Sequence, residues 1–126
     1  MSKRPLFPAD KLLPAAAQKI ASNFDGTLRE IEDAIAHNDV VVVGMAQNPH
    51  VKNVRAALSA AGIAFHYLEY GSYLSEWKRR LAIKMWTGWP TFPQVFVRGQ
   101  FVGGEDLTKA ALADGSLKTL LSTAKA

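Results

Sequence analysis

The apolar positions of the chain follow two patterns, helical spacing and short continuous runs, which together predict alternating helices and strands. Residues 40–45 form a continuous, mostly β-branched run, as expected for a strand covered on both faces in a sheet with parallel neighbours. Apolar residues recur at helical spacing over 28–38 and again over 51–63, where Gly62 is a stop signal. A buried central strand between two amphipathic helices is therefore predicted.

The second half of the chain predicts the rest of the sheet. Residues 64–70 alternate apolar and polar positions and predict a strand, and two short apolar runs joined at Arg98 and Gly99 predict a β-hairpin. Two further helices are expected, over 105–115 and 116–126. The order of elements predicts an α/β domain whose four-stranded mixed sheet is flanked by helices.

One more helix is predicted between the second strand and the hairpin. Ser72 is a candidate N-cap for a helix over 73–88. Its apolar residues are expected to face the core, namely Leu74, Trp77, Leu81 and Trp86.

The first residues predict an N-terminal extension, 1–22, ahead of the domain at 23–126. Prolines interrupt this extension, which therefore lacks the continuous apolar region of a signal peptide, and its alanines fit one short helix over 14–21. The longest apolar stretch, 40–46, is far short of the ~20 residues that span a bilayer. A cytoplasmic protein without a membrane partner is predicted.

The amino-acid composition excludes several kinds of reactive or metal-binding site. The chain has 126 residues, a net charge of +4 and no cysteine. Without cysteine it offers no disulfide, thiolate metal site or cysteine nucleophile, and three histidines on separate elements predict no metal site. The positive charges are scattered rather than clustered, so no nucleic-acid partner is predicted.

Three segments, in this order, resemble glutaredoxins, the small proteins of the thioredoxin fold that use glutathione. These are TLREIEDAIAHNDVVVV, WPTFPQVFVRGQFVGG and EDLTKAALADGSL, and the likeness extends over about residues 27–121. The pattern is most similar to the single-cysteine, or monothiol, subgroup. The resemblance implies a thioredoxin-like fold.

The resemblance stops at the motif that carries the family's chemistry. Where glutaredoxins have Cys-x-x-Cys or Cys-Gly-Phe-Ser, this chain has Asn48, Pro49, His50 and Val51. An asparagine amide has neither the nucleophilicity nor the redox couple of a thiolate, so no thiol–disulfide exchange is predicted. No iron–sulfur cluster is expected either, because the protein thiolate that would hold it is missing. His50 is interpreted as a partly exposed loop histidine.

The glutathione groove of the family is matched more fully. The resemblance implies a cis peptide bond before Pro93, and contacts to glutathione from the backbone amide of Glu105 and the carboxylate of Asp106. Arg80 stands where the family keeps an arginine for the glycyl carboxylate, and Lys52 follows the motif. The full set implied for glutathione is Lys52, Arg80, Thr91, Phe92, Pro93, Gly104, Glu105 and Asp106. Ordinary roles, a helix cap for Asp106 and a solvated face for the basic residues, stay open beside this one.

Three functions are compatible with these residues. The first is a redox-inactive binding module that holds glutathione or a partner peptide in the groove. The second is a transferase-like enzyme in which the thiol of bound glutathione lies at the N-terminus of the 51–63 helix, near Asn48 or His50. The third is a structural or regulatory protein whose extension and exposed aromatics, Tyr73 and Trp77, contact a partner while the groove is vestigial.

Overall fold

The computed structural model describes residues 8–11, 13–16 and 25–122. Its elements are η1 (Ala9–Lys11), α2 (Asp25–His37), β1 (Val40–Gly44), α3 (Pro49–Ala60), β2 (His66–Glu69), α4 (Trp77–Thr87), β3 (Gln94–Val97), β4 (Gln100–Gly103), α5 (Glu105–Ala113) and α6 (Ser116–Ser122). This is the predicted order of helices and strands after the extension. The helix expected over 14–21 lies largely outside the described residues, of which 14–16 are helical.

The four strands form one mixed sheet in the order β2-β1-β3-β4. β1 is central, and all five of its residues are buried. It pairs in parallel with β2 and antiparallel with β3, so the prediction of parallel neighbours is right on one side only. The difference follows from connectivity, because β3 pairs with β4 as a hairpin and the pair adds to β1 in the opposite direction.

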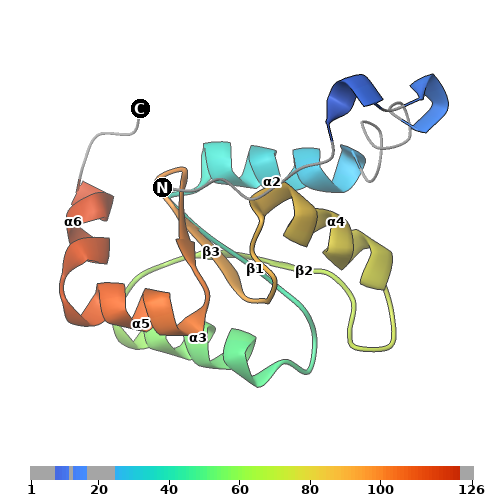
Figure 1. Ribbon diagram of the computed structural model, residues 1–126. Helices are drawn as coiled ribbons and strands as arrows, with labels where there is room; N and C mark the ends of the chain where they lie inside the picture. The colour runs from blue at the N-terminus through green and yellow to red at the C-terminus, as the bar shows by residue number, and fades with distance from the viewer. Residues whose placement is uncertain (1–7, 12, 17–24, 123–126) are drawn as a thin grey trace.

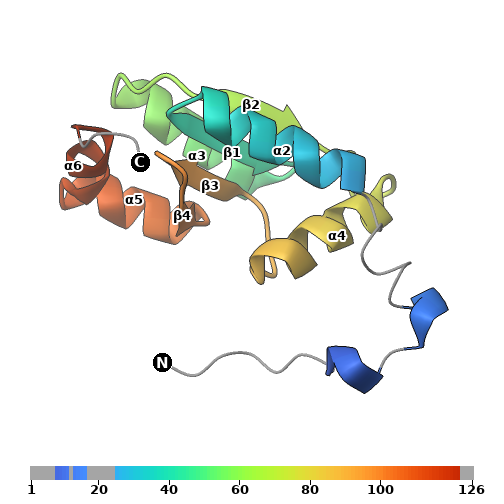
Figure 2. The ribbon, with the colours of Figure 1, turned by 90° about the horizontal axis from the view of Figure 1, so that it is seen from above.

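Helices cover both faces of the sheet, with α2 and α4 on one face and α3 and α5 on the other (Figures 1 and 2). Alternate residues of β1 point to opposite faces: Val41 and Val43 pack with α2 and α4, whereas Val40 and Val42 pack with α3 and α6. Every residue of β1 is apolar because the strand contributes to a separate apolar core on each face of the sheet. Among the described residues, no helix is both long and apolar enough to cross a membrane.

The helix predicted over 73–88 is wrong at its start and in its orientation. α4 begins at Trp77, because Ser72 bridges to Ser75 in a turn and its hydroxyl contacts that turn instead of capping the helix. The residues of α4 that face the core are Arg80, Ala82 and Ile83. The four residues predicted to face inward are exposed, Leu74 at 96%, Trp77 at 59%, Leu81 at 45% and Trp86 at 38%.

Candidate functional site

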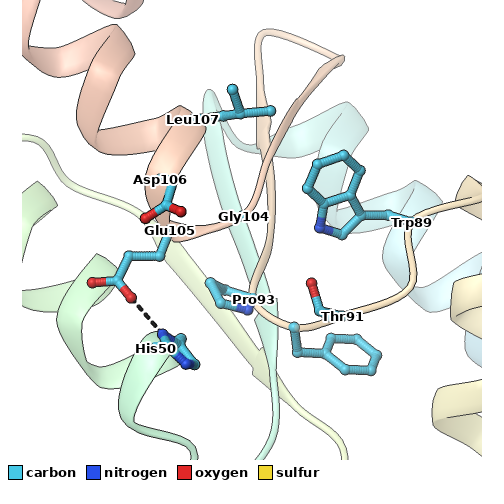
Figure 3. A pocket seen from close by; sticks show the side chains of 9 residues that line it. His50, Trp89, Thr91, Pro93, Gly104, Glu105, Asp106 and Leu107 are labelled. Atoms are coloured by element: carbon cyan, nitrogen blue, oxygen red, sulfur yellow. Dashed lines mark hydrogen bonds and ion pairs between the residues drawn. The ribbon is translucent and has the colours of Figure 1, made fainter.

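A cavity of about 500 Å³ lies where the starts of α3 and α5 meet the segment before β3 (Figure 3). It is lined by His50, Trp89, Thr91, Phe92, Pro93, Gly104, Glu105, Asp106 and Leu107. Six of these residues, Thr91 to Pro93 and Gly104 to Asp106, belong to the set predicted for glutathione. The structure therefore brings residues of the second and third resembling segments together in one cavity.

The start of α3, which brings His50 to the cavity, is capped by Asn48. Asn48 has an extended backbone, and its side-chain Oδ1 accepts hydrogen bonds from the amides of His50 at 2.9 Å and Val51 at 3.2 Å. Pro49 follows at the first helical position, where its missing N–H costs nothing. These amides are the donors that an anion at a helix N-terminus would use. In this chain both amides already donate to the side-chain oxygen of Asn48.

Val51, at the last motif position, belongs to the core instead of the cavity. Its side chain is buried beneath α3 and faces Gly44 at the end of β1. A Cβ built on Gly44 would lie 2.6 Å from Val51 Cγ1, so only glycine lets the start of α3 approach the strand this closely. A branched apolar residue here packs the sheet and supplies no chemistry.

His50 is the second residue of α3 and joins a charged cluster at the cavity wall, so its interpretation as a loop histidine is wrong. Its Nδ1 lies 2.6 Å from Glu105 Oε1, and Lys109 Nζ lies 2.7 Å from Glu105 Oε2. Hydrogen bonds from Lys109, and then from His50, lower the pKa of Glu105 to about 2. The carboxylate is therefore ionised at neutral pH and links α3 to α5.

A buried glutamine, which the sequence analysis does not identify, shapes the opposite wall. Gln94 is fully buried, and its Nε2 donates to the carbonyls of Trp89 at 3.1 Å and Thr91 at 3.3 Å. Its Oε1 accepts a hydrogen bond from the Thr87 hydroxyl at 2.9 Å. The Phe92–Pro93 peptide bond in this segment is cis. The only available signal is that a polar residue opens the apolar run QVFV.

The α5 wall is open. Gly104 is the N-cap residue of α5 and makes no side-chain cap, so the backbone faces the cavity without a blocking group. A Cβ on Gly104 would come within 3.3 Å of Trp89 Nε1 and 3.5 Å of the Pro93 carbonyl oxygen. Trp89 Nε1 is itself buried and has no hydrogen-bond partner within the described part of the chain. This side of the cavity thus keeps a narrow space beside a buried donor.

Two residues of the predicted set lie elsewhere. Arg80 is buried beneath α4, where its Nη1 donates to the carbonyls of Ser75 and Tyr70 and holds the turn before the helix. Lys52 lines a second cavity of about 460 Å³ together with Asn48, Arg55 and Tyr67. The structure does not bring either side chain to the first cavity. Across the described residues, no group of three or more His, Asp and Glu side chains could hold a metal ion.

Comparisons with known proteins place the chain among glutaredoxins. The family model described as glutaredoxin matches residues 40–102. A glutaredoxin-like protein of Dictyostelium discoideum is 56% identical over 90 residues, which are 71% of this chain and 73% of the relative. A monothiol glutaredoxin of Synechocystis is 34% identical over 105 residues, covering 79% of this chain and 95% of the relative. The crystal structure of a buckwheat glutaredoxin–glutathione complex matches with a TM-score of 0.71 at 23% identity, over 80% of this chain and 92% of that one.

Proposed function

The chain belongs to the glutaredoxin family, and from this premise we propose that it binds glutathione in the cavity between α3 and α5 without thiol–disulfide exchange. One observation carries the proposal: the start of α5 has no side-chain cap at Gly104, whereas the start of α3, where the family carries its thiolate, is capped by Asn48. Binding and redox chemistry are thus separated in the same site.

The absence of exchange follows from composition and from the cap. The chain has no cysteine to attack a disulfide, and no other side chain has an equivalent redox couple. The His50 and Val51 amides, which would favour a thiolate at this helix end, are bonded to Asn48 Oδ1. A bound thiol would meet neither a partner sulfur nor free helix amides here.

The γ-glutamyl end of glutathione fits the start of α5. In the proposed pose its carboxylate accepts from the backbone amide of Glu105, and the Asp106 carboxylate accepts from its ammonium group. The helix dipole favours the negative group at this end. Glu105 contributes only its backbone, because its side chain is engaged by Lys109 and His50.

The middle of the tripeptide fits the segment before β3. Phe92 lies in the segment ahead of β3 that lines the cavity, and in the proposed pose its backbone pairs with the extended tripeptide as an added strand would. Lys84 is the cation we assign to the glycyl carboxylate, because its Nζ lies 5.6 Å from the Phe92 ring centroid while Arg80 is committed to Ser75 and Tyr70. This proposal replaces the arginine contact that the family resemblance implies.

The test is a titration with reduced glutathione followed by amide chemical shifts. Shifts localised to Thr91, Phe92, Glu105 and Asp106 are expected, and S-methylglutathione should bind within about twofold because no contact uses the thiol. Asp106→Asn should weaken binding about fivefold or more, since it removes a charge-assisted hydrogen bond at a partly open site. Asp33→Asn, an exposed carboxylate on α2, is the matched control. Absence of localised shifts, or equal affinity of Asp106→Asn and the wild type, would overturn the proposal.

A transferase-like enzyme is the second candidate, and the His50–Glu105 contact favours it. With Nδ1 engaged by the carboxylate, the other ring nitrogen of His50, Nε2, is the group at the cavity wall that would take the proton of a bound thiol. Conjugation of glutathione to an electrophile such as 1-chloro-2,4-dinitrobenzene distinguishes the two functions. Turnover that His50→Ala removes, without loss of glutathione affinity, would establish the enzyme. No turnover above the solution rate leaves the binding module.

A further inference from the structure

A row of large apolar side chains covers the outer side of α4 and the turn before it. We call this the α4 surface and define it by Tyr73, Leu74, Trp77 and Leu81, which are exposed at 59%, 96%, 59% and 45%. Trp77 and Leu81 are four residues apart and therefore neighbours on one helix face. Met85, 54% exposed, continues the row.

The α4 surface is not required by the core beneath it. The opposite side of α4 packs with α2 and the sheet through Ile83 and also carries the buried Arg80. Removing the exposed row would leave these contacts intact. Single exposed apolar residues are ordinary, whereas a contiguous group of aromatic and aliphatic side chains marks an interaction surface.

The charges around the α4 surface are positive. The helix contains four basic residues and no acidic one, namely Lys78, Arg79, Arg80 and Lys84. Glu76 precedes the helix and pairs with Arg79 at 3.4 Å, and Arg80 is buried. Lys78 lies on the exposed side, with its Nζ 5.7 Å from the Trp77 ring centroid. The α4 surface therefore combines apolar contact area with one cation, Lys78, that is not paired with an acidic residue in the described structure.

We propose that the α4 surface docks an acidic helical segment of a partner protein, with an apolar face against Trp77 and Leu81 and carboxylates toward Lys78. The surface is a ridge on a helix, which packs naturally against another helix. This inference is independent of glutathione binding, since none of the residues lines the cavity between α3 and α5.

Charge argues against the two occupants that the chain itself could supply. The N-terminal segment 1–24 carries four basic residues, Lys3, Arg4, Lys11 and Lys19, against the single acidic residue Asp10. A second copy docked through the same face would place Lys78 of both copies at one apolar contact. Docking of the N-terminal segment or of a second copy would bring positive charges together. An acidic partner would instead bring negative charges to Lys78.

The test uses a synthetic helical peptide of about 18 residues with leucine along one face and glutamate elsewhere, and a matched peptide with lysine for glutamate. The glutamate peptide should shift amides of residues 73–85 in a saturable way, and the lysine peptide should bind at least about tenfold more weakly. The double variant Trp77→Ala/Leu81→Ala should lower the affinity about tenfold or more. Lys78→Glu should lower it several-fold at low salt, and Leu13→Ala, which removes an exposed leucine outside this surface, should not change it.

Four results would overturn the proposal. Equal affinity for the glutamate and lysine peptides would show that the partner need not be acidic. Unchanged affinity of Lys78→Glu for the glutamate peptide would show the same. Binding to vesicles with 30% phosphatidylserine that Trp77→Ala/Leu81→Ala abolishes, with no peptide binding, would identify a membrane surface. A dimer in sedimentation that the same double variant disperses would identify a second copy. Circular dichroism of each variant confirms that the fold is kept, which is expected because the changed side chains are exposed.

Discussion

The two helix starts that meet at the cavity treat their backbone amides in opposite ways. At α3, the side chain of Asn48 caps the helix. It accepts hydrogen bonds from the His50 and Val51 amides, so these two amides are not available to a ligand. At α5, Gly104 supplies no side chain, and the buried Trp89 Nε1 nearby has no partner in the described structure. The amides at the α3 start are bonded to a side chain of the same chain, whereas the α5 start has no side-chain cap.

This difference shows how the residue at one helix start decides what the helix amides do. A cysteine at the start of α3 would use these amides to lower its pKa, whereas asparagine uses the same amides to cap the helix. The asparagine therefore stabilises α3 at the position where a thiolate would otherwise lie.

The largest effect should come from returning a thiol to the capped start. Asn48→Cys is expected to give a thiol that is readily alkylated. Its apparent pKa should lie clearly below the ~8.5 of a free cysteine, because the thiolate would accept hydrogen bonds from the His50 and Val51 amides. The pH dependence of the reaction with iodoacetamide measures it. Ser59→Cys, near the opposite end of α3, is the control and should show no lowered pKa. Equal values for both thiols would mean that the α3 start does not favour an anion.

Filling the open start should have the next largest effect. Gly104→Ala places a methyl group 3.3 Å from Trp89 Nε1, so we expect glutathione affinity to fall about tenfold. The backbone of Gly104 has φ −98°, which any residue adopts, so unfolding should change by less than about 1 kcal/mol. Calorimetry with Gly26→Ala as control checks the change, since a Cβ at Gly26 meets nothing within 4 Å. Unchanged affinity in Gly104→Ala would place the ligand elsewhere.

Removing the cap alone should affect stability and spare binding. Asn48→Ala is expected to cost about 1 kcal/mol in the free energy of unfolding, and Asn48→Asp, which keeps an acceptor, should recover most of it. Both variants should bind glutathione within about twofold of the wild type. Denaturant unfolding and calorimetry give the two quantities. A large loss of affinity in Asn48→Ala would show that the two starts are coupled.

The smallest effect concerns the charged link between the two starts. Ionisation of Glu105 stabilises the fold, because Lys109 and His50 lower its pKa from 4.5 to about 2. Compared with Glu105→Gln, the wild type should gain stability that is fully present above about pH 5 and is lost as the pH falls toward 2. Exposed ion pairs of this kind contribute below about 1 kcal/mol. Unfolding free energies of both proteins from pH 7 to 2.5 test it, and parallel curves would contradict it.

The sheet and four of its helices could be predicted because each has a local signal. The run at β1, the glycine after α3 and the turn at Arg98 and Gly99 all act within a few residues. α4 could not be oriented in this way, since it has apolar residues on both sides. The row at Trp77 and Leu81 has the clearer helical spacing, yet the side with Ile83 is the one that meets the sheet.

The cavity was predicted better than its supporting contacts. The resemblance identifies Thr91 to Pro93 and Gly104 to Asp106, which are close in sequence within two segments. Arg80 was assigned to the glycyl carboxylate because it stands where the family keeps an arginine, but its guanidinium donates to the Ser75 and Tyr70 carbonyls across a turn that no local pattern reveals. The His50–Glu105 contact joins residues 55 positions apart, so spacing carries no sign of it.

Gln94 has one further consequence, for the kinetics of ligand exchange. Its amide ties Trp89 and Thr91 to β3, so the segment beside the cavity is already ordered before anything enters. Little binding free energy is then spent on ordering the protein. No closing of the segment over a bound ligand is needed that would slow dissociation. Association near the ordinary protein–ligand range and residence times of milliseconds or less are expected, which corresponds to fast exchange in amide spectra. Gln94→Ala should release both carbonyls, broaden these resonances and slow the approach to the bound state.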